Sequence, residues 1–217
     1  MLLNRIVVGQ YQANCYILGN ETTRRGIVID PGAEFLRIWE EISRLNLTVE
    51  KILLTHAHID HIGAVAEMVK KTQAKLFLHP ADLLLYSSMS EKLNADFSGQ
   101  SEQIIQPEAL EENMEIICGE IKLTVRHTPG HTRGSVCLLG GGTLFTGDTL
   151  FHGSIGRTDF PYASLEQILV SIQEKILTLD DQTVIYPGHG PRTNLEWERK
   201  YNPFLRKEFL QQHQHQK

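Results

Sequence analysis

The chain has 217 residues, of which 41% are hydrophobic and 22% charged, and its formal net charge is −5. This composition excludes disordered, collagen-like and coiled-coil chains. The acidic balance without a basic tract excludes a nucleic-acid groove, which needs clustered Lys and Arg. No segment approaches the ~20 apolar residues of a transmembrane helix, and the N-terminus does not have the pattern of a signal peptide, so no membrane partner is expected. Three widely spaced cysteines, Cys15, Cys118 and Cys137, predict reduced thiols in a cytoplasmic protein.

In the first part of the chain, apolar runs alternate with helical patterns. Strands are predicted at Tyr16–Leu18 and Gly26–Ile29, the second ending in a turn at Asp30. Apolar residues at helical spacing between Phe35 and Leu45 predict a helix with one buried face. A further short strand at Val49–Leu54 is followed by a polar stretch and then by a helix at Ile62–Thr72.

The second part of the chain is predicted to be richer in strands. A capping box formed by Ser164 and Gln167 predicts the start of a helix. The glycines Gly140-Gly141-Gly142 are typical of a hairpin turn between two of the strands. The strands are predicted at Ile121–Arg126, Gly134–Leu139, Thr143–Thr146 and Val184–Tyr186.

Two segments have no clear pattern. Ser87–Asn113 is polar and too long for a plain connection, so it is either a lid over a binding site or an indifferent surface loop. The polar tail at Gln211–Lys217 is expected to be frayed. Because there is no internal repeat and no linker, residues 1–210 are predicted to form one domain.

Four segments share one arrangement, in which an apolar run ends in small residues and then presents His or Asp. They are Thr55-His56-Ala57-His58-Ile59-Asp60-His61, Thr128-Pro129-Gly130-His131-Thr132, Phe145-Thr146-Gly147-Asp148-Thr149 and Tyr186-Pro187-Gly188-His189-Gly190. Side chains at i and i+2 of an extended chain point the same way, so His56 and His58 can bind one ion. Asp60 and His61 follow at the turn into a helix and can face a second. Burying so many ionisable groups without a cation would be costly, so the cluster predicts a metal site.

These four strings, in this order, resemble the metallo-β-lactamase superfamily, and within it the glyoxalase II (hydroxyacylglutathione hydrolase) group. The resemblance extends from about Asn14 to Leu205. It implies an α/β (α+β) fold, an αββα sandwich with a dinuclear metal centre at one edge of its two sheets. It further implies that His56, His58 and His131 hold the first metal, that Asp60, His61 and His189 hold the second, and that Asp148 bridges both.

Such a centre indicates a metal-dependent hydrolase. Zinc suits the first group, and the second group, which is richer in oxygen, accepts zinc, iron or manganese. Because metal lowers the pKa of bound water to about 7, a bridging hydroxide can attack a carbonyl while Asp60 orients it, and no Ser or Cys nucleophile is needed. A thioester such as S-lactoylglutathione is a fitting substrate because its thiolate leaves without strong acid help.

The closest resemblance is to compact, single-domain glyoxalase-II-like proteins, which share Gly-Ser-Ile-Gly-Arg-Thr-Asp-Phe-Pro and Asn-Pro-Phe-Leu with this chain. Only 28 residues follow His189, too few for the helical glutathione-binding domain of two-domain relatives. Arg157 stands where the family has a glutathione-binding lysine. It therefore either binds substrate or pairs with Asp159, which replaces a family tyrosine.

Several alternatives use the same residues. Persulfide dioxygenases resemble the same strings and would hold a single iron with His56, His131 and Asp148. A nuclease would need a basic surface, and an exported β-lactamase would need a signal peptide. A purely structural zinc site is normally closed by four ligands, whereas seven ligands around two ions leave open positions. The acyl group, the native metal and the oligomeric state are left open by the sequence.

Overall fold

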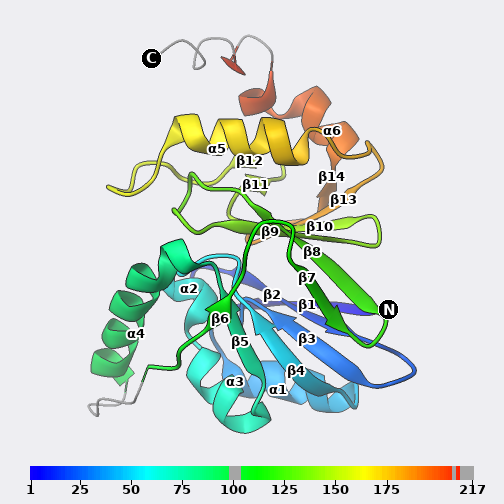
Figure 1. The fold of residues 1–217 in the computed structure, drawn as a ribbon, viewed down its shortest axis with the longest axis vertical. Coiled ribbons are helices and arrows are strands. Elements are labelled where there is room, and N and C mark those ends of the chain that lie inside the picture. Colours follow the sequence, from blue (N-terminus) through cyan, green and yellow to red (C-terminus); the bar gives the residue numbers. More distant parts are fainter. Residues whose placement is uncertain (98–103, 207–208, 211–217) are drawn as a thin grey trace.

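Two six-stranded sheets pack face to face, and helices cover the outer face of each, in a computed structural model that describes residues 1–97, 104–206 and 209–210 (Figure 1). The helices α1 (Phe35–Arg44) and α3 (Val65–Thr72) lie on the outside of the first sheet, and α5 (Leu165–Ser171) and α6 (Leu195–Tyr201) lie on the outside of the second. This order of layers confirms the predicted αββα sandwich.

The first sheet is formed by the N-terminal part of the chain. Strands β1, β2 and β3 pair antiparallel with one another, and the pairs from β3 through β4 and β5 to β6 are parallel. In spatial order the strands are β1 (Leu2–Val8), β2 (Ala13–Gly19), β3 (Arg25–Ile29), β4 (Thr48–Leu53), β5 (Lys75–Leu78) and β6 (Glu108–Ala109).

The second sheet is mostly antiparallel, with one parallel pair between β10 and β13. Its spatial order is β14 (Thr193–Asn194), β13 (Val184–Pro187), β10 (Thr143–Gly147), β9 (Val136–Gly140), β8 (Ile121–His127) and β7 (Glu115–Cys118). The predicted hairpin joins β9 to β10, where Gly141 and Gly142 both have positive φ angles of 58° and 75°. A two-residue turn with both residues in this region matches the twist of the flanking strands, which explains the glycines.

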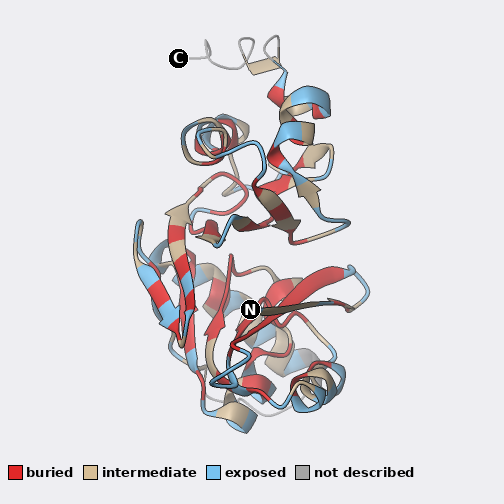
Figure 2. Cartoon of the chain, turned by 90° about the vertical axis from the view of Figure 1, so that its right-hand side faces the viewer, coloured by how far each residue is buried: buried red, intermediate tan, exposed pale blue. Residues whose placement is uncertain are grey.

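Three apolar cores separate the four layers, and the buried residues gather on the strands (Figure 2). Strand β2 contributes side chains to two of these cores. Cys15 and Ile17 face the helices of the first layer, whereas Tyr16 and Leu18 face the second sheet. Because side chains alternate along a strand and both faces are covered, all seven residues of β2 are buried.

The helix predicted at Ile62–Thr72 begins later than expected. A short helix α2 (Ile59–Ile62) precedes it, and α3 starts at Val65. The Ala64 N–H donates to the Pro31 carbonyl at 2.9 Å, and a side chain on Gly63 would lie 2.3 Å from the Gly32 carbonyl oxygen. The close approach of the turn after β3 therefore interrupts the helix at this point.

The segment Ser87–Asn113, predicted to lack regular structure, is partly helical. Its first residues belong to α4 (Leu83–Phe97), which follows a 3₁₀ turn η1 (Pro80–Asp82). Within α4, Leu85, Met89 and Leu93 pack on the first core beside the buried Tyr86. This narrow stripe at a spacing of four residues gives α4 one apolar face against the core, but it is hard to recognise within a polar segment. Residues 98–103 of the segment lie outside the described residues, as does the tail 211–217.

The helix predicted from the capping box begins as expected. The Ser164 side-chain oxygen accepts a hydrogen bond from the Gln167 N–H at 3.2 Å, and α5 continues as a π-helical segment η2 (Ile172–Ile176). The remaining short elements are the hairpin β11 (Leu150–Phe151) and β12 (Ser154–Ile155) and the 3₁₀ turn η3 (Pro203–Leu205). Within the described part of the chain, no helix has the length and apolar character needed to cross a bilayer.

Candidate metal centre

The seven candidate ligands lie together at one edge of the sandwich, although they come from four separate segments. Four follow β4 directly: His56 and His58 in the loop, Asp60 and His61 in α2. The other three follow strands of the second sheet: His131 after β8, Asp148 after β10 and His189 after β13. The sheets meet at this edge, so both contribute to one site.

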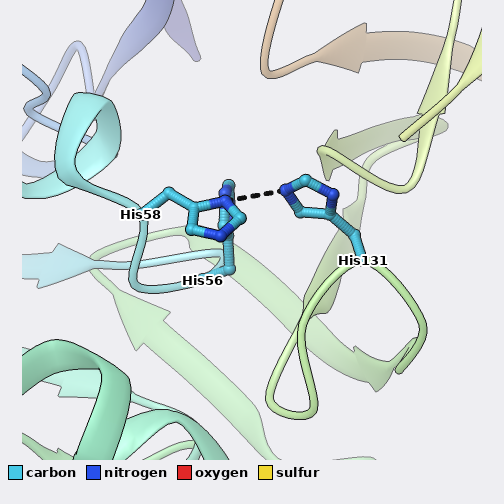
Figure 3. Close-up of side chains that lie close together, drawn as sticks. All are labelled: His56, His58 and His131. Atoms are coloured by element: carbon cyan, nitrogen blue, oxygen red, sulfur yellow. Dashed lines mark hydrogen bonds between the residues drawn. The ribbon is translucent and has the colours of Figure 1, made fainter. Parts of the chain in front are cut away.

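The first group consists of His56, His58 and His131 and is here called the three-histidine group. One nitrogen of each ring lies within 4.8 Å of the others. Figure 3 shows the rings of His58 and His131 pointing at one another beside His56, with His58 Nδ1 2.8 Å from His131 Nε2. The Nε2 atom of His56 is buried and has no hydrogen-bond partner among the described residues.

The second group consists of Asp60, His61 and His189 and is here called the mixed group. Its ligand atoms also lie within 4.8 Å of one another. The Asp60 Oδ2 atom is 3.2 Å from His189 Nε2 and 3.8 Å from His61 Nε2, and the two histidine Nε2 atoms are 3.3 Å apart.

Asp148 lies between the two groups. Its Oδ2 atom is 3.5 Å from His131 Nε2 and 3.6 Å from His189 Nε2, and its Oδ1 atom is 3.5 Å from His61 Nε2. This Oδ1 atom is buried and, among the described residues, has no hydrogen-bond partner. A side chain at Gly188 would lie 2.2 Å from it, so only glycine leaves space beside this carboxylate.

The electrostatics of the two groups differ. Burial, together with the neighbouring imidazoles, lowers the pKa of His56 well below its usual value and that of His58 to about 3. Burial alone would also lower the pKa of His61, but Asp148 and the hydrogen bond to Asp30 outweigh it and raise this pKa to about 9. Burial likewise opposes the shift at His189, whose pKa is raised by its hydrogen bond to Asp60 and the charge of Asp148.

The residues present fit divalent metal ions. Imidazole nitrogens and carboxylate oxygens converge from different loops, and two of these buried atoms, His56 Nε2 and Asp148 Oδ1, lack a protein partner among the described residues. A buried polar atom without a partner costs free energy, which a bound cation would remove. Nitrogen-rich and oxygen-containing groups of this kind suit zinc, iron or manganese.

Two buried carboxylates form hydrogen bonds around the site, and neither role follows from the local sequence pattern. Asp30, expected only to start a turn, accepts hydrogen bonds from the Thr55 N–H at 2.7 Å and hydroxyl at 2.6 Å, and lies 3.0 Å from His61 Nδ1. The one feature of the sequence that indicates this role is the position of Asp30 at the end of an apolar strand.

Asp82, at the end of η1, joins the two ligand loops. It accepts hydrogen bonds from the Ala57 N–H at 3.1 Å, the Thr132 hydroxyl at 2.7 Å and the Gly134 N–H at 2.7 Å. Burial raises the pKa of Asp82 in spite of these bonds. No local pattern in the sequence distinguishes this aspartate from a surface residue.

Arg157 lies beside the three-histidine group. Its guanidinium forms two hydrogen bonds with the exposed Asp159, at 3.0 and 2.8 Å, and lies 4.8 Å from the centre of the Phe160 ring. Its backbone carbonyl is 2.8 Å from His131 Nδ1. The pairing of Arg157 with Asp159, one of the two expectations from the sequence, is therefore present, and the exposed guanidinium is also accessible to a substrate.

Among the described residues, the histidines outside the centre stack on other rings, and the cysteines lie in the apolar cores. The rings of His79 and His127 stack at 3.9 Å, and His152 stacks on Trp197 at 4.0 Å. All three cysteines are buried and unpaired.

The chain belongs to the metallo-β-lactamase superfamily, whose family model, described as "Metallo-beta-lactamase superfamily", matches residues 8–189. Among curated relatives, the probable metallo-hydrolase YqgX of Bacillus subtilis is 37% identical over 94% of this chain and 98% of the relative. The hydroxyacylglutathione hydrolase GloC of Haemophilus influenzae is 32% identical over 94% of this chain and 98% of the relative.

Solved structures agree with this assignment. The crystal structure of TTHA1623 in a di-iron-bound form is 36% identical with a TM-score of 0.81, covering 93% of this chain and 100% of that one. The crystal structure of ETHE1 from Myxococcus xanthus is 28% identical with a TM-score of 0.79, covering 99% of this chain and 91% of that one. The sequence resemblance to this superfamily is thereby confirmed.

Proposed function

We propose that this chain is a metal-dependent hydrolase of small thioesters such as S-lactoylglutathione, working with two divalent ions held by the three-histidine and mixed groups and shared by Asp148. Zinc is the preferred ion, and iron or manganese is an alternative in the mixed group. The observation that carries the proposal is the convergence of seven candidate ligands from four segments, with the buried atoms His56 Nε2 and Asp148 Oδ1 lacking a partner among the described residues.

Bound ions would supply an ionised water near neutral pH and polarise the thioester carbonyl. Residues of the chain would orient the attacking water and bind the substrate. The Asp60 carboxylate, whose pKa is lowered by its hydrogen bond to His189 and the charge of His61 against the opposing effect of burial, is ionised and orients the attacking water. Arg157, which is largely exposed, would bind a carboxylate of the substrate thiol by exchanging it for Asp159.

A thiol nucleophile has no support. Burial raises the pKa of Cys137 to about 11, and likewise raises that of Cys118 to about 11 and that of Cys15 still further. A buried neutral thiol is a poor nucleophile. The same three unpaired cysteines support the proposal that the protein works in the cytoplasm.

The similarity to GloC supports a hydroxyacylglutathione substrate, and the similarity to the di-iron form of TTHA1623 supports a site for two ions. The test is loss of the thioester absorbance of S-lactoylglutathione with protein that has been stripped of metal and reloaded with zinc, iron or manganese. We expect turnover that disappears on stripping and returns on reloading.

The iron-loaded protein is assayed in parallel for oxygen consumption with glutathione persulfide. Oxygen uptake with one iron per chain, and no thioester cleavage with any metal, would replace the hydrolase by a persulfide dioxygenase. Cleavage with two ions per chain excludes that alternative.

A further inference from the structure

An aromatic pair lies beside the three-histidine group, in the segment between β12 and α5. The rings of Phe160 and Tyr162 are nearly parallel, with an interplanar angle of 10° and centroids 5.7 Å apart. The Phe160 ring lies 5.0 Å from that of His58, and the Tyr162 ring 6.0 Å from it. This segment therefore covers one side of His58.

The Tyr162 hydroxyl also contacts His58 directly, at 2.7 Å from Nε2. The other nitrogen of that ring, Nδ1, points to His131 Nε2 at 2.8 Å. A histidine binds metal through its unprotonated nitrogen, and the partner of the second nitrogen determines which one that is. When Nδ1 is left free for a metal, Nε2 carries the proton and donates it to the Tyr162 oxygen.

His58 differs in this respect from the other four histidines of the centre. Each of those faces the site with Nε2 and turns Nδ1 outward, to the Thr55 hydroxyl, the Asp30 carboxylate, the Arg157 carbonyl or the Tyr11 carbonyl. The partners of His131 and His189 are backbone, and those of His56 and His61 are buried side chains. His58 alone of the five is held by a partly exposed side chain on a loop, 104 positions away.

We propose that Tyr162 is a positioning residue that holds His58 in the tautomer and orientation that directs Nδ1 into the three-histidine group. The inference rests on the proposed metal-dependent function, since the orientation of His58 matters only if it binds an ion. It assigns to the segment after the bridging carboxylate a role in metal binding that is separate from the role of Arg157 toward substrate.

The test is the variant Tyr162→Phe, which keeps the ring beside Phe160 and removes only the hydroxyl. The matched control is Tyr201→Phe, because the Tyr201 ring packs on Trp197 in α6 and does not belong to the centre. Zinc affinity is measured by competition with a chromophoric chelator, and imidazole ¹⁵N NMR of the zinc-loaded protein reports the tautomer of His58 and which group is filled.

We expect Tyr162→Phe to weaken zinc binding at the three-histidine group about 10–100-fold, to change the ¹⁵N shifts of His58, and to leave the mixed group and the thermal midpoint of unfolding unchanged. Tyr201→Phe should behave as wild type. Affinity within twofold of wild type, with unchanged His58 shifts, would overturn the role of Tyr162 while leaving the proposed function intact. A wild-type chain that binds no zinc would overturn both.

Discussion

Each group of the candidate metal centre contains a histidine from the short segment after β4, and yet the electrostatics of these two histidines are opposite. His58 and His61 are three positions apart, but the pKa of His58 is lowered to about 3 and that of His61 is raised to about 9. Burial acts on both in the same direction. The difference comes from their neighbours, because His58 faces other imidazoles whereas His61 faces the carboxylates of Asp148, Asp30 and Asp60.

The difference in pKa determines whether each histidine carries a proton when it meets a metal ion. In the metal-free chain near pH 7, His58 is neutral and presents a lone pair without any change of charge. His61 is protonated and must release its proton before it can bind an ion. The carboxylates around His61 therefore distinguish it from His58, although both residues are buried imidazoles.

Removal of Asp148 should impair metal binding at both groups, because this residue contacts both. We expect Asp148→Ala to lower thioester turnover by about a thousandfold, corresponding to loss of several kcal/mol of metal-dependent stabilisation of the transition state. Metal content per chain, measured by plasma mass spectrometry, should fall below two. Asp180→Ala, which changes an exposed aspartate in the turn before β13, is the control. Two retained ions and near-normal turnover would refute the bridging role.

Asp82 should affect the three-histidine group and the fold together. Asp82→Asn replaces one carboxylate oxygen by an amide NH₂ group, which cannot accept a hydrogen bond. This group then faces either the Gly134 N–H or the pair formed by the Ala57 N–H and the Thr132 hydroxyl. The free energy of unfolding should fall by about 3 kcal/mol, since buried donors lose a charged acceptor. Urea denaturation measures it, with Asp159→Asn as the exposed control. A change below about 0.5 kcal/mol would show that these bonds contribute little.

Asp60 should separate the two groups. Asp60→Ala removes the carboxylate that we propose orients the attacking water, but leaves His56, His58 and His131 intact. We expect turnover to fall about a hundredfold while the far-UV circular dichroism and one bound ion per chain are retained. Turnover within a few-fold of wild type would show that Asp60 does not orient the nucleophile.

The pH dependence of zinc binding sharpens the comparison further. The raised pKa of His61 means that the mixed group holds a proton below about pH 9, so its zinc affinity should rise about tenfold per pH unit between pH 6 and 8. The lowered pKa of His58 predicts no such rise at the three-histidine group over the same range. Chelator competition at three pH values tests both expectations. The variant Asp60→Ala, which lacks one ligand of the mixed group, reports on the three-histidine group alone. Equal slopes at the two groups would contradict the assignment.

Much of the fold followed from local patterns. The apolar runs predicted β2, β3, β4, β8, β9, β10 and β13, although not β1, β5 or β7. The glycines at 140–142 predicted the hairpin, and Ser164 with Gln167 predicted the start of α5. The helix α4 was missed because only one narrow stripe, including Leu85, Met89 and Leu93, is apolar in a polar segment. Whether such a stripe is buried depends on a surface supplied by another part of the chain.

The amino-acid sequence by itself determined that the candidate ligands between His56 and His61 lie together, because a strand that ends in a turn brings neighbouring residues to the same edge whatever the rest of the chain does. It also determined the order in which His131, Asp148 and His189 follow strand ends. Only the tertiary structure decided which protons these groups carry, how Asp82 joins the two ligand loops, and that Tyr162 reaches His58. These properties depend on contacts between residues up to 128 positions apart, and on the removal of water around them, which no local pattern encodes.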